Sequence, residues 1–241
     1  MYALMVGVAV AAPCETTLDV KPVRQHGTHR IEAASVAALS ARGAMLDPRE
    51  LAGSRPREAP TEGPFELQQA LKLHGWDTLV FEGTPDEGAR LIEAGFAPVA
   101  ILEAAQSSHV LTLMGVRRMQ APDGRCVGAA MELATMDPRT GQTGWISASE
   151  LARQQRGARM LVSFEPTAWS ALDDAGFDVG TATREDRRYR ASALMAKARR
   201  RPAPDEESIA LLERAVAADP AWSVPRDLLD VHRQALLDPP P

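Results

Sequence analysis

Residues 31–43 read IEAASVAALSARG, a stretch dominated by alanine that ends in glycine. Alanine is the strongest helix former, and a glycine just after the last helical residue readily adopts the backbone conformation that closes a helix. The apolar residues are spread over most faces of the predicted helix instead of forming one stripe. This pattern is typical of a domain interior, so residues 31–42 are predicted to be a central, buried helix.

Short apolar runs separated by turn residues follow this helix. Two of them, residues 109–116 and 127–136, are separated by a Pro-Asp-Gly turn, which predicts a long hairpin. Helical patterns that end in glycine precede them, at residues 65–74 and 85–94. Because helices come first and a mostly antiparallel sheet comes second, the sequence predicts an α+β fold and not alternating βαβ units.

The chain divides into three segments. An apolar segment spans residues 1–17, the α+β domain spans 18–167 and a helical extension spans 168–241. A length of 241 residues allows one large domain with a small appendage. Within the extension, helices are predicted at residues 187–201, 205–218 and 224–237.

The first residues, MYALMVGVAVAAP at 1–13, are apolar and carry no charged side chain. The run is too short to span a bilayer as a helix, but it is similar to the core of a secretory signal that lacks the positive start. A buried strand and a misplaced start codon are the alternatives. Cys14 follows as at a lipoprotein cleavage site, although the preceding proline departs from that pattern. We therefore expect export, periplasmic or membrane-anchored, over a cytoplasmic location, with membrane association through this segment alone.

The composition argues against several classes of function. A net charge of −5 disfavours a nucleic-acid binder, because such proteins carry a basic excess. Cys14 and Cys126 are too few for a disulfide framework and lack the spacing of metal ligands. His26 and His29 have no third ligand nearby, so neither a metal nor another cofactor is expected. The frequent alanine and arginine suggest a GC-rich bacterial genome.

Three residues follow the order that thiol-protease chemistry requires. Gln25 lies six residues before the buried helix, where a side-chain amide can stabilise an oxyanion. His109 opens a strand and can act as a base, and Asp137 closes the paired strand and can orient that base. Each residue has a structural alternative: an ordinary loop residue for Gln25, a half-buried histidine for His109 and a turn initiator for Asp137.

In this order and spacing, residues 18–167 resemble the bacteriocin-processing (double-glycine leader) peptidases of the papain-like superfamily. The resemblance includes the run Gly95-Phe96-Ala97-Pro98 before the histidine and the pair Asp137-Pro138. It implies a papain-like fold, with N-terminal helices packed on a mostly antiparallel sheet. It also implies a catalytic site that contains Gln25, His109 and Asp137. The family begins its buried helix with the catalytic cysteine, and that position is Ile31 here.

The loss of the nucleophile decides the expected activity. Isoleucine has no lone pair that could attack a carbonyl, Ser35 lies one turn too late to replace it, and Thr28 lies in a loop. We therefore expect a catalytically degenerate peptidase-like domain, with a vestigial site, that binds a peptide or protein partner. The alternative is an active cysteine peptidase of this type whose nucleophile lies elsewhere in the chain.

The extension has a resemblance of its own. Residues 209–220, IALLERAVAADP, are similar to a helix and the following proline turn of a tetratricopeptide repeat. Such repeats need about three copies to bury their faces, and no second full copy is evident. A helical appendage packed on the main domain is expected, and a scaffold that recruits a partner through this tail is the alternative.

Overall fold

The computed structural model describes residues 14–237 apart from 26, 28, 55–63, 104–107, 121–125, 155–158, 178, 200 and 202. The apolar segment at residues 1–13 and the predicted hairpin turn at 122–124 lie outside this set. Among the helices that the structure describes, none is both long enough and apolar enough to cross a membrane.

The strands form one sheet in which every described pair is antiparallel. Its order is β2-β7-β3-β4-β5-β6, and β1 also pairs with β4. The bounds are β1 Cys14–Thr17, β2 Asp77–Glu82, β3 Val99–Glu103, β4 Ser108–Gln120, β5 Cys126–Asp137, β6 Gln142–Ser147 and β7 Arg159–Phe164. The predicted hairpin is β4–β5, and the predicted α+β class with a mostly antiparallel sheet is confirmed.

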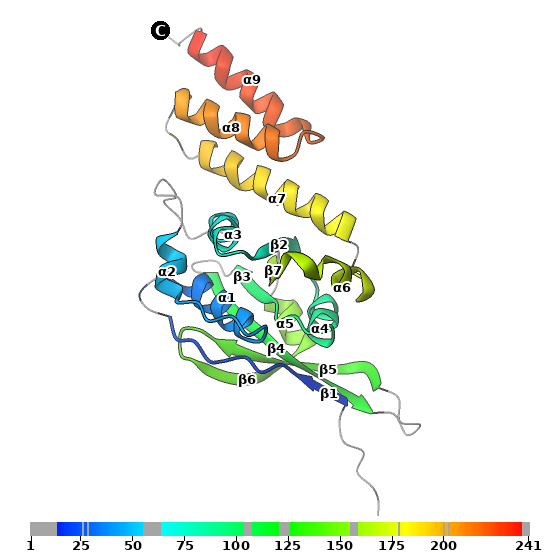
Figure 1. The fold of residues 1–241 in the computed structure, drawn as a ribbon. Coiled ribbons are helices and arrows are strands. Elements are labelled where there is room, and N and C mark those ends of the chain that lie inside the picture. Colours follow the sequence, from blue (N-terminus) through cyan, green and yellow to red (C-terminus); the bar gives the residue numbers. More distant parts are fainter. Residues whose placement is uncertain are drawn as a thin grey trace, which may run out of the picture.

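Helices precede and flank this sheet and then continue beyond it (Figure 1). Their bounds are α1 Arg30–Ser40, α2 Pro48–Gly53, α3 Pro64–Leu73, α4 Pro85–Glu93, α5 Ala148–Gln154, the 3-10 turn η1 Pro166–Ala168, α6 Trp169–Asp174, α7 Val179–Arg199, α8 Glu206–Ala218 and α9 Ser223–Leu237.

Helix α1 is the buried helix that the alanine-rich stretch predicts. All of its residues from Ile31 to Leu39 are buried. Its main chain contacts the sheet directly, because the Thr112 hydroxyl of β4 donates a hydrogen bond to the Ala34 carbonyl oxygen over 2.9 Å. Gly43 follows the helix with a φ of 81°, a conformation that glycine adopts without strain.

The central strands of the sheet are buried on both faces by two apolar clusters. On one face, α1, α2 and α3 pack against residues that include Val80 and Val110. On the other face, α4, α5 and α6 pack against residues that include Leu79, Phe81 and Leu111. The consecutive residues of β2 and β4 therefore alternate between the two clusters, as the pleat of a strand requires.

The last three helices stack outward from the β2 edge of the sheet (Figure 1). Helix α7 packs on β2, α8 packs on α7, and α9 packs on α8. Helix α3 contacts α7 through Phe65, which packs against Ala191 and Leu194. Leu172 and Phe177 follow the predicted domain boundary at residue 167, yet both belong to the core cluster on the α4 face. The outward stack therefore begins with α7, which starts at Val179 and not at the predicted residue 187.

A disulfide bond joins Cys14 of β1 to Cys126 at the start of β5, 112 positions later. The two strands lie on opposite sides of β4, with Cys14 opposite Arg118 and Cys126 opposite Gln120. Sequence separation alone does not predict this pairing, because it does not show that both strands adjoin β4.

Candidate functional site

Ile31, at the predicted nucleophile position, is a core residue. It lies in the first turn of α1, is 4% exposed and belongs to the same apolar cluster as Val110 and Met136. Its side chain fills space between the helix and the sheet. The start of the buried helix therefore offers hydrocarbon at the position where the sequence resemblance predicts the nucleophile.

The structure brings Gln25 close to the turn that begins at Asp137. The Gln25 backbone N–H donates to the Pro138 carbonyl oxygen over 2.7 Å, and its side-chain amide donates to the Gly27 carbonyl oxygen over 3.1 Å. Asp137 Oδ1 accepts from the Arg139 backbone N–H over 2.8 Å. Both side chains thus bond to backbone atoms near them in sequence.

His109 lies on the other face of the sheet from α1. It pairs with Leu102 across β3 and β4, and paired residues share a face. Leu102 and Leu111 belong to the cluster that packs against α4, whereas Thr112 bonds to α1. Within the described residues, no hydrogen bond or ion pair joins His109 to Gln25 or Asp137.

Polar side chains nevertheless gather at the start of α1. Glu32 is fully buried, and its Oε1 lies 3.6 Å from His29 Nδ1. Ser35, one turn later, is also fully buried. A carboxylate in the first turn of a helix is stabilised by the positive end of the helix dipole. A negative charge at this position is also unsuitable for activating a thiolate.

A cavity of about 470 Å³ lies between α3, β2, α6 and α7, and we call it the α3–α7 cavity. The side chains that define it include Gln68, Leu73, Trp76, Asp77, Trp169 and Arg190. This cavity is not evident from the sequence, because its residues come from three segments far apart in the chain. The one local signal was the pair Trp76-Asp77, a large aromatic ring and a carboxylate at the start of β2.

Two buried or half-buried carboxylates border the α3–α7 cavity. Asp77 accepts hydrogen bonds from Lys72 and, over 3.0 Å, from the Trp169 indole N–H. Desolvation alone would raise the pKa of Asp77, but the bonds from Lys72 and Trp169 outweigh it and lower that pKa below its usual value. Burial raises the pKa of Asp186, and the charge of Arg190 offsets only part of this effect.

Asp186 also covers the free edge of the sheet. Its Oδ1 accepts from the Val80 backbone N–H over 3.4 Å and from Gln68 Nε2 over 2.9 Å, and Gln68 Nε2 donates to the Thr78 carbonyl oxygen as well. Its Oδ2 pairs with Arg190 over 2.7 Å. Side chains of α3 and α7 therefore take up the backbone groups of β2 that a further strand would otherwise bind.

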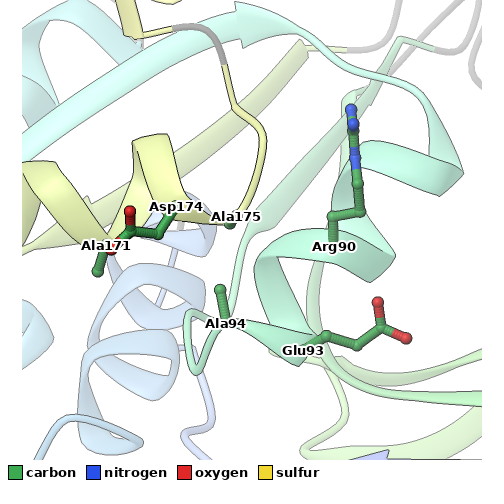
Figure 2. Close-up of a pocket in the computed structure, with 6 residues that line it drawn as sticks. All are labelled: Arg90, Glu93, Ala94, Ala171, Asp174 and Ala175. Carbon is green, nitrogen blue, oxygen red and sulfur yellow. The ribbon is translucent and has the colours of Figure 1, made fainter.

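A second hollow, of about 420 Å³, lies between α4 and α6. Figure 2 shows Arg90 and Glu93 projecting from α4, with Asp174 on α6 and three alanines among them. Glu93 already pairs with Arg118. Within the described ranges, no three His, Cys, Asp or Glu side chains gather closely enough to hold a metal ion. This hollow has no large apolar side chain to anchor a ligand, so the α3–α7 cavity is the better candidate.

No family model and no curated protein matches the chain. Among solved structures, it is similar to the peptidase domain of Streptococcus ComA, a bi-functional ABC transporter involved in a quorum-sensing pathway, with 12% identity, a TM-score of 0.45, and coverage of 59% of this chain and 97% of that one. It is also similar to a double-glycine-motif protease from an AMS/PCAT transporter in complex with the leader peptide, with 13% identity, a TM-score of 0.43, and coverage of 63% and 97%. At such low identity the likeness concerns the fold alone.

Proposed function

We propose that this protein is a catalytically degenerate peptidase-like domain that binds a peptide or protein partner. One observation supports the proposed loss of activity: the chain contains two cysteines, and they are bonded to each other. No thiol is therefore available as a nucleophile, and Ile31 occupies the position where one would be expected.

Thiol labelling tests the first part of this proposal. The oxidised protein is incubated with an iodoacetamide probe, and a sample that is first unfolded and reduced serves as the positive control. We expect labelling at Cys14 and Cys126 in the control alone. Rapid labelling of the folded protein that disappears in His109→Ala would contradict the proposal, because it would reveal a thiolate activated by that histidine.

Peptide hydrolysis separates the proposal from its enzymatic alternative. An active cysteine peptidase of the double-glycine type would cleave leader-type peptides that end in two glycines and would lose this activity in His109→Ala. The proposed domain leaves such peptides intact under both oxidising and reducing conditions. Turnover that depends on His109 would establish the alternative.

A scaffold role of the helical tail is a second candidate, and one observation favours it. The outermost helix, α9, exposes Val224, Val231, Leu236 and Leu237, with exposed fractions from 38% to 77%. A further helix could pack on these residues as repeats do. A pull-down should use Val231→Asp and not a deletion from residue 168, because that deletion would remove Leu172 and Phe177 from the core. An unchanged set of partners would reject the scaffold role.

We also propose that the chain folds in an oxidising compartment. Disulfides persist in secreted and periplasmic proteins and are rare where glutathione keeps thiols reduced. The bond between Cys14 and Cys126 supports export on this ground, independently of the apolar residues at 1–13. Alkylation of free thiols in intact cells, followed by mass spectrometry, tests the idea. Both cysteines alkylated without prior reduction would contradict it.

A further inference from the structure

The two edges of the sheet differ in whether their backbone groups are covered. At the β2 edge, Asp186 accepts from the Val80 N–H and Gln68 donates to the Thr78 carbonyl oxygen. At the opposite edge, β6 pairs with β5 alone among the described strands, and Figure 1 shows it on the far side of the sheet from the stacked helices α7–α9. Alternate residues of β6 therefore direct N–H and C=O groups away from the sheet, where another strand can bind them.

Strand β6, QTGWIS, lacks the features by which edge strands avoid such pairing. Proteins commonly protect an exposed edge with a lysine, a proline or a bulge. Strand β6 contains no charged residue and no proline, and its register with β5 runs without a shift from Gln142 to Ser147. Five of its six residues are exposed, and Ile146 is half-buried. This regular and neutral edge suits an uncharged extended strand.

The two faces of β6 present different groups beside this edge. Ile146 packs against the core cluster on the α4 face, and Gly144, two residues earlier, shares that face. A Cβ added at Gly144 would meet no atom within 4 Å, so the strand has an open gap next to Ile146. On the opposite face, Trp145 is 39% exposed and stacks on Arg117, with 4.3 Å between the guanidinium carbon and the ring centroid.

The charges next to Trp145 neutralise each other. Arg117 forms an ion pair with Glu132 of β5, with 2.8 Å between Arg117 Nε and Glu132 Oε2. This pair leaves no net charge beside Trp145. A second copy of β6 is also uncharged, so pairing two copies brings no like charges together within the two strands.

We propose that β6 is a self-association surface, to which β6 of a second copy adds in antiparallel orientation. A two-fold axis perpendicular to the sheet keeps the faces of both copies aligned, so the copies pair around one residue. With Trp145 on the axis, the two indole rings meet, and Ile146 of each copy lies opposite Gly144 of the other and fills its gap. With Gly144 on the axis, two glycines would face each other and the gap would stay open. The Trp145 register is therefore the one we assign.

Sedimentation equilibrium of the full, oxidised chain tests the association. We expect the mass to rise from 26.0 kDa towards twice this value between about 1 and 500 μM, because one pair of strands forms a small interface of low affinity. Gly144→Lys should weaken dimerisation about ten-fold, because the two added charges lie diagonally across the axis. The open space at Gly144 accommodates this side chain in the monomer.

Leu73→Lys is the matched control for the added charge. Leu73 lies on α3 and is 76% exposed, so the variant changes the net charge equally without touching β6. Its dimerisation should equal that of the unchanged protein.

Cysteine variants test the register. With Trp145 on the axis, Thr143 of one copy faces Ser147 of the other. A mixture of Thr143→Cys and Ser147→Cys proteins should therefore form a disulfide-linked dimer on oxidation, seen by non-reducing electrophoresis. The native cysteines do not interfere, because they are already bonded to each other. Either variant alone should stay unlinked, since its two thiols lie four positions apart, about 13 Å along the strand.

Each contrary result overturns a different part of the proposal. A constant monomer mass up to about 500 μM would reject self-association. A dimer that Gly144→Lys leaves intact would reject β6 as its surface. Equal linking in the mixture and in the single variants would reject the Trp145 register. None of these results depends on the peptide binding proposed above.

Discussion

Replacing both bonded cysteines, Cys14→Ser together with Cys126→Ser, removes the disulfide without leaving a free thiol. The bond closes a loop across 112 positions of the chain. In the chain-entropy description, a cross-link of this span raises the free energy of the unfolded chain by about 4.8 kcal/mol at 25 °C. This value is the upper end of the expected loss of stability.

The actual loss depends on whether β1 unfolds together with the domain. Strand β1 has only four residues, and it could detach alone if little else held it. However, Leu18 directly after it packs against both core clusters and donates a backbone hydrogen bond to Met114, and Val20 is 6% exposed in one cluster. We therefore expect β1 to unfold with the sheet, and the double variant to lose about 3–5 kcal/mol.

Urea unfolding followed by circular dichroism measures this loss. With an m-value near 3 kcal/mol/M, the midpoint of the double variant should fall by about 1–1.7 M relative to the oxidised protein. The oxidised protein with added dithiothreitol should match the variant, and the variant itself should not respond to dithiothreitol. Equal midpoints for the oxidised and reduced protein would refute the reasoning, because they would show that β1 lies outside the cooperative unit.

Further perturbations test the site geometry. Ile31→Cys should give a thiol with ordinary reactivity and no peptidase activity, because His109 lies on the opposite face of the sheet. The prediction would be contradicted if adding His109→Ala to Ile31→Cys changed the pH profile of alkylation. Asp186→Ala should lower the free energy of unfolding by roughly 2–3 kcal/mol in urea titrations, because Val80 N–H and Gln68 Nε2 lose the acceptor that they share. A loss below about 0.5 kcal/mol would argue against the role of Asp186 in covering the free edge of β2. The folded protein lowers the pKa of Asp77, so the ionised carboxylate stabilises the fold above the unfolded pKa near 3.9, and this stabilisation is lost as the pH falls through the folded pKa. Between pH 5 and pH 2, the melting temperature of Asp77→Asn should therefore fall less than that of the unchanged protein.

Local patterns were sufficient to predict the elements that form the body of the domain. The alanine-rich run at 31–42 corresponds to α1, which spans Arg30–Ser40, and the two apolar runs around the Pro-Asp-Gly turn correspond to β4 and β5. The helix and the hairpin depend on preferences of residues close together in the chain. Alanine loses little side-chain entropy in a helix, and proline and glycine favour turns. The α+β order follows from these elements without any knowledge of their contacts.

Other features depend on which segments meet in space. The order of Gln25, His109 and Asp137 along the chain predicts that they form one site. However, the strand register decides on which face of the sheet a side chain lies, and a shift of one residue moves it to the opposite face. Pairing of β1 and β5 with opposite edges of β4 decides that Cys14 meets Cys126. Neither register nor strand order is recorded in local propensities.

By itself, the sequence determined the buried helix, the hairpin, the antiparallel α+β class and the absence of sulfur at the start of that helix. The tertiary structure alone decided the disulfide, the face on which His109 lies and the cavity that Gln68, Trp169 and Arg190 line together. The physical reason is one of range. Helix and turn preferences act over a few residues, whereas a bond, a shared sheet face or a cavity requires groups that only the packing of the whole chain brings within a few ångströms of each other.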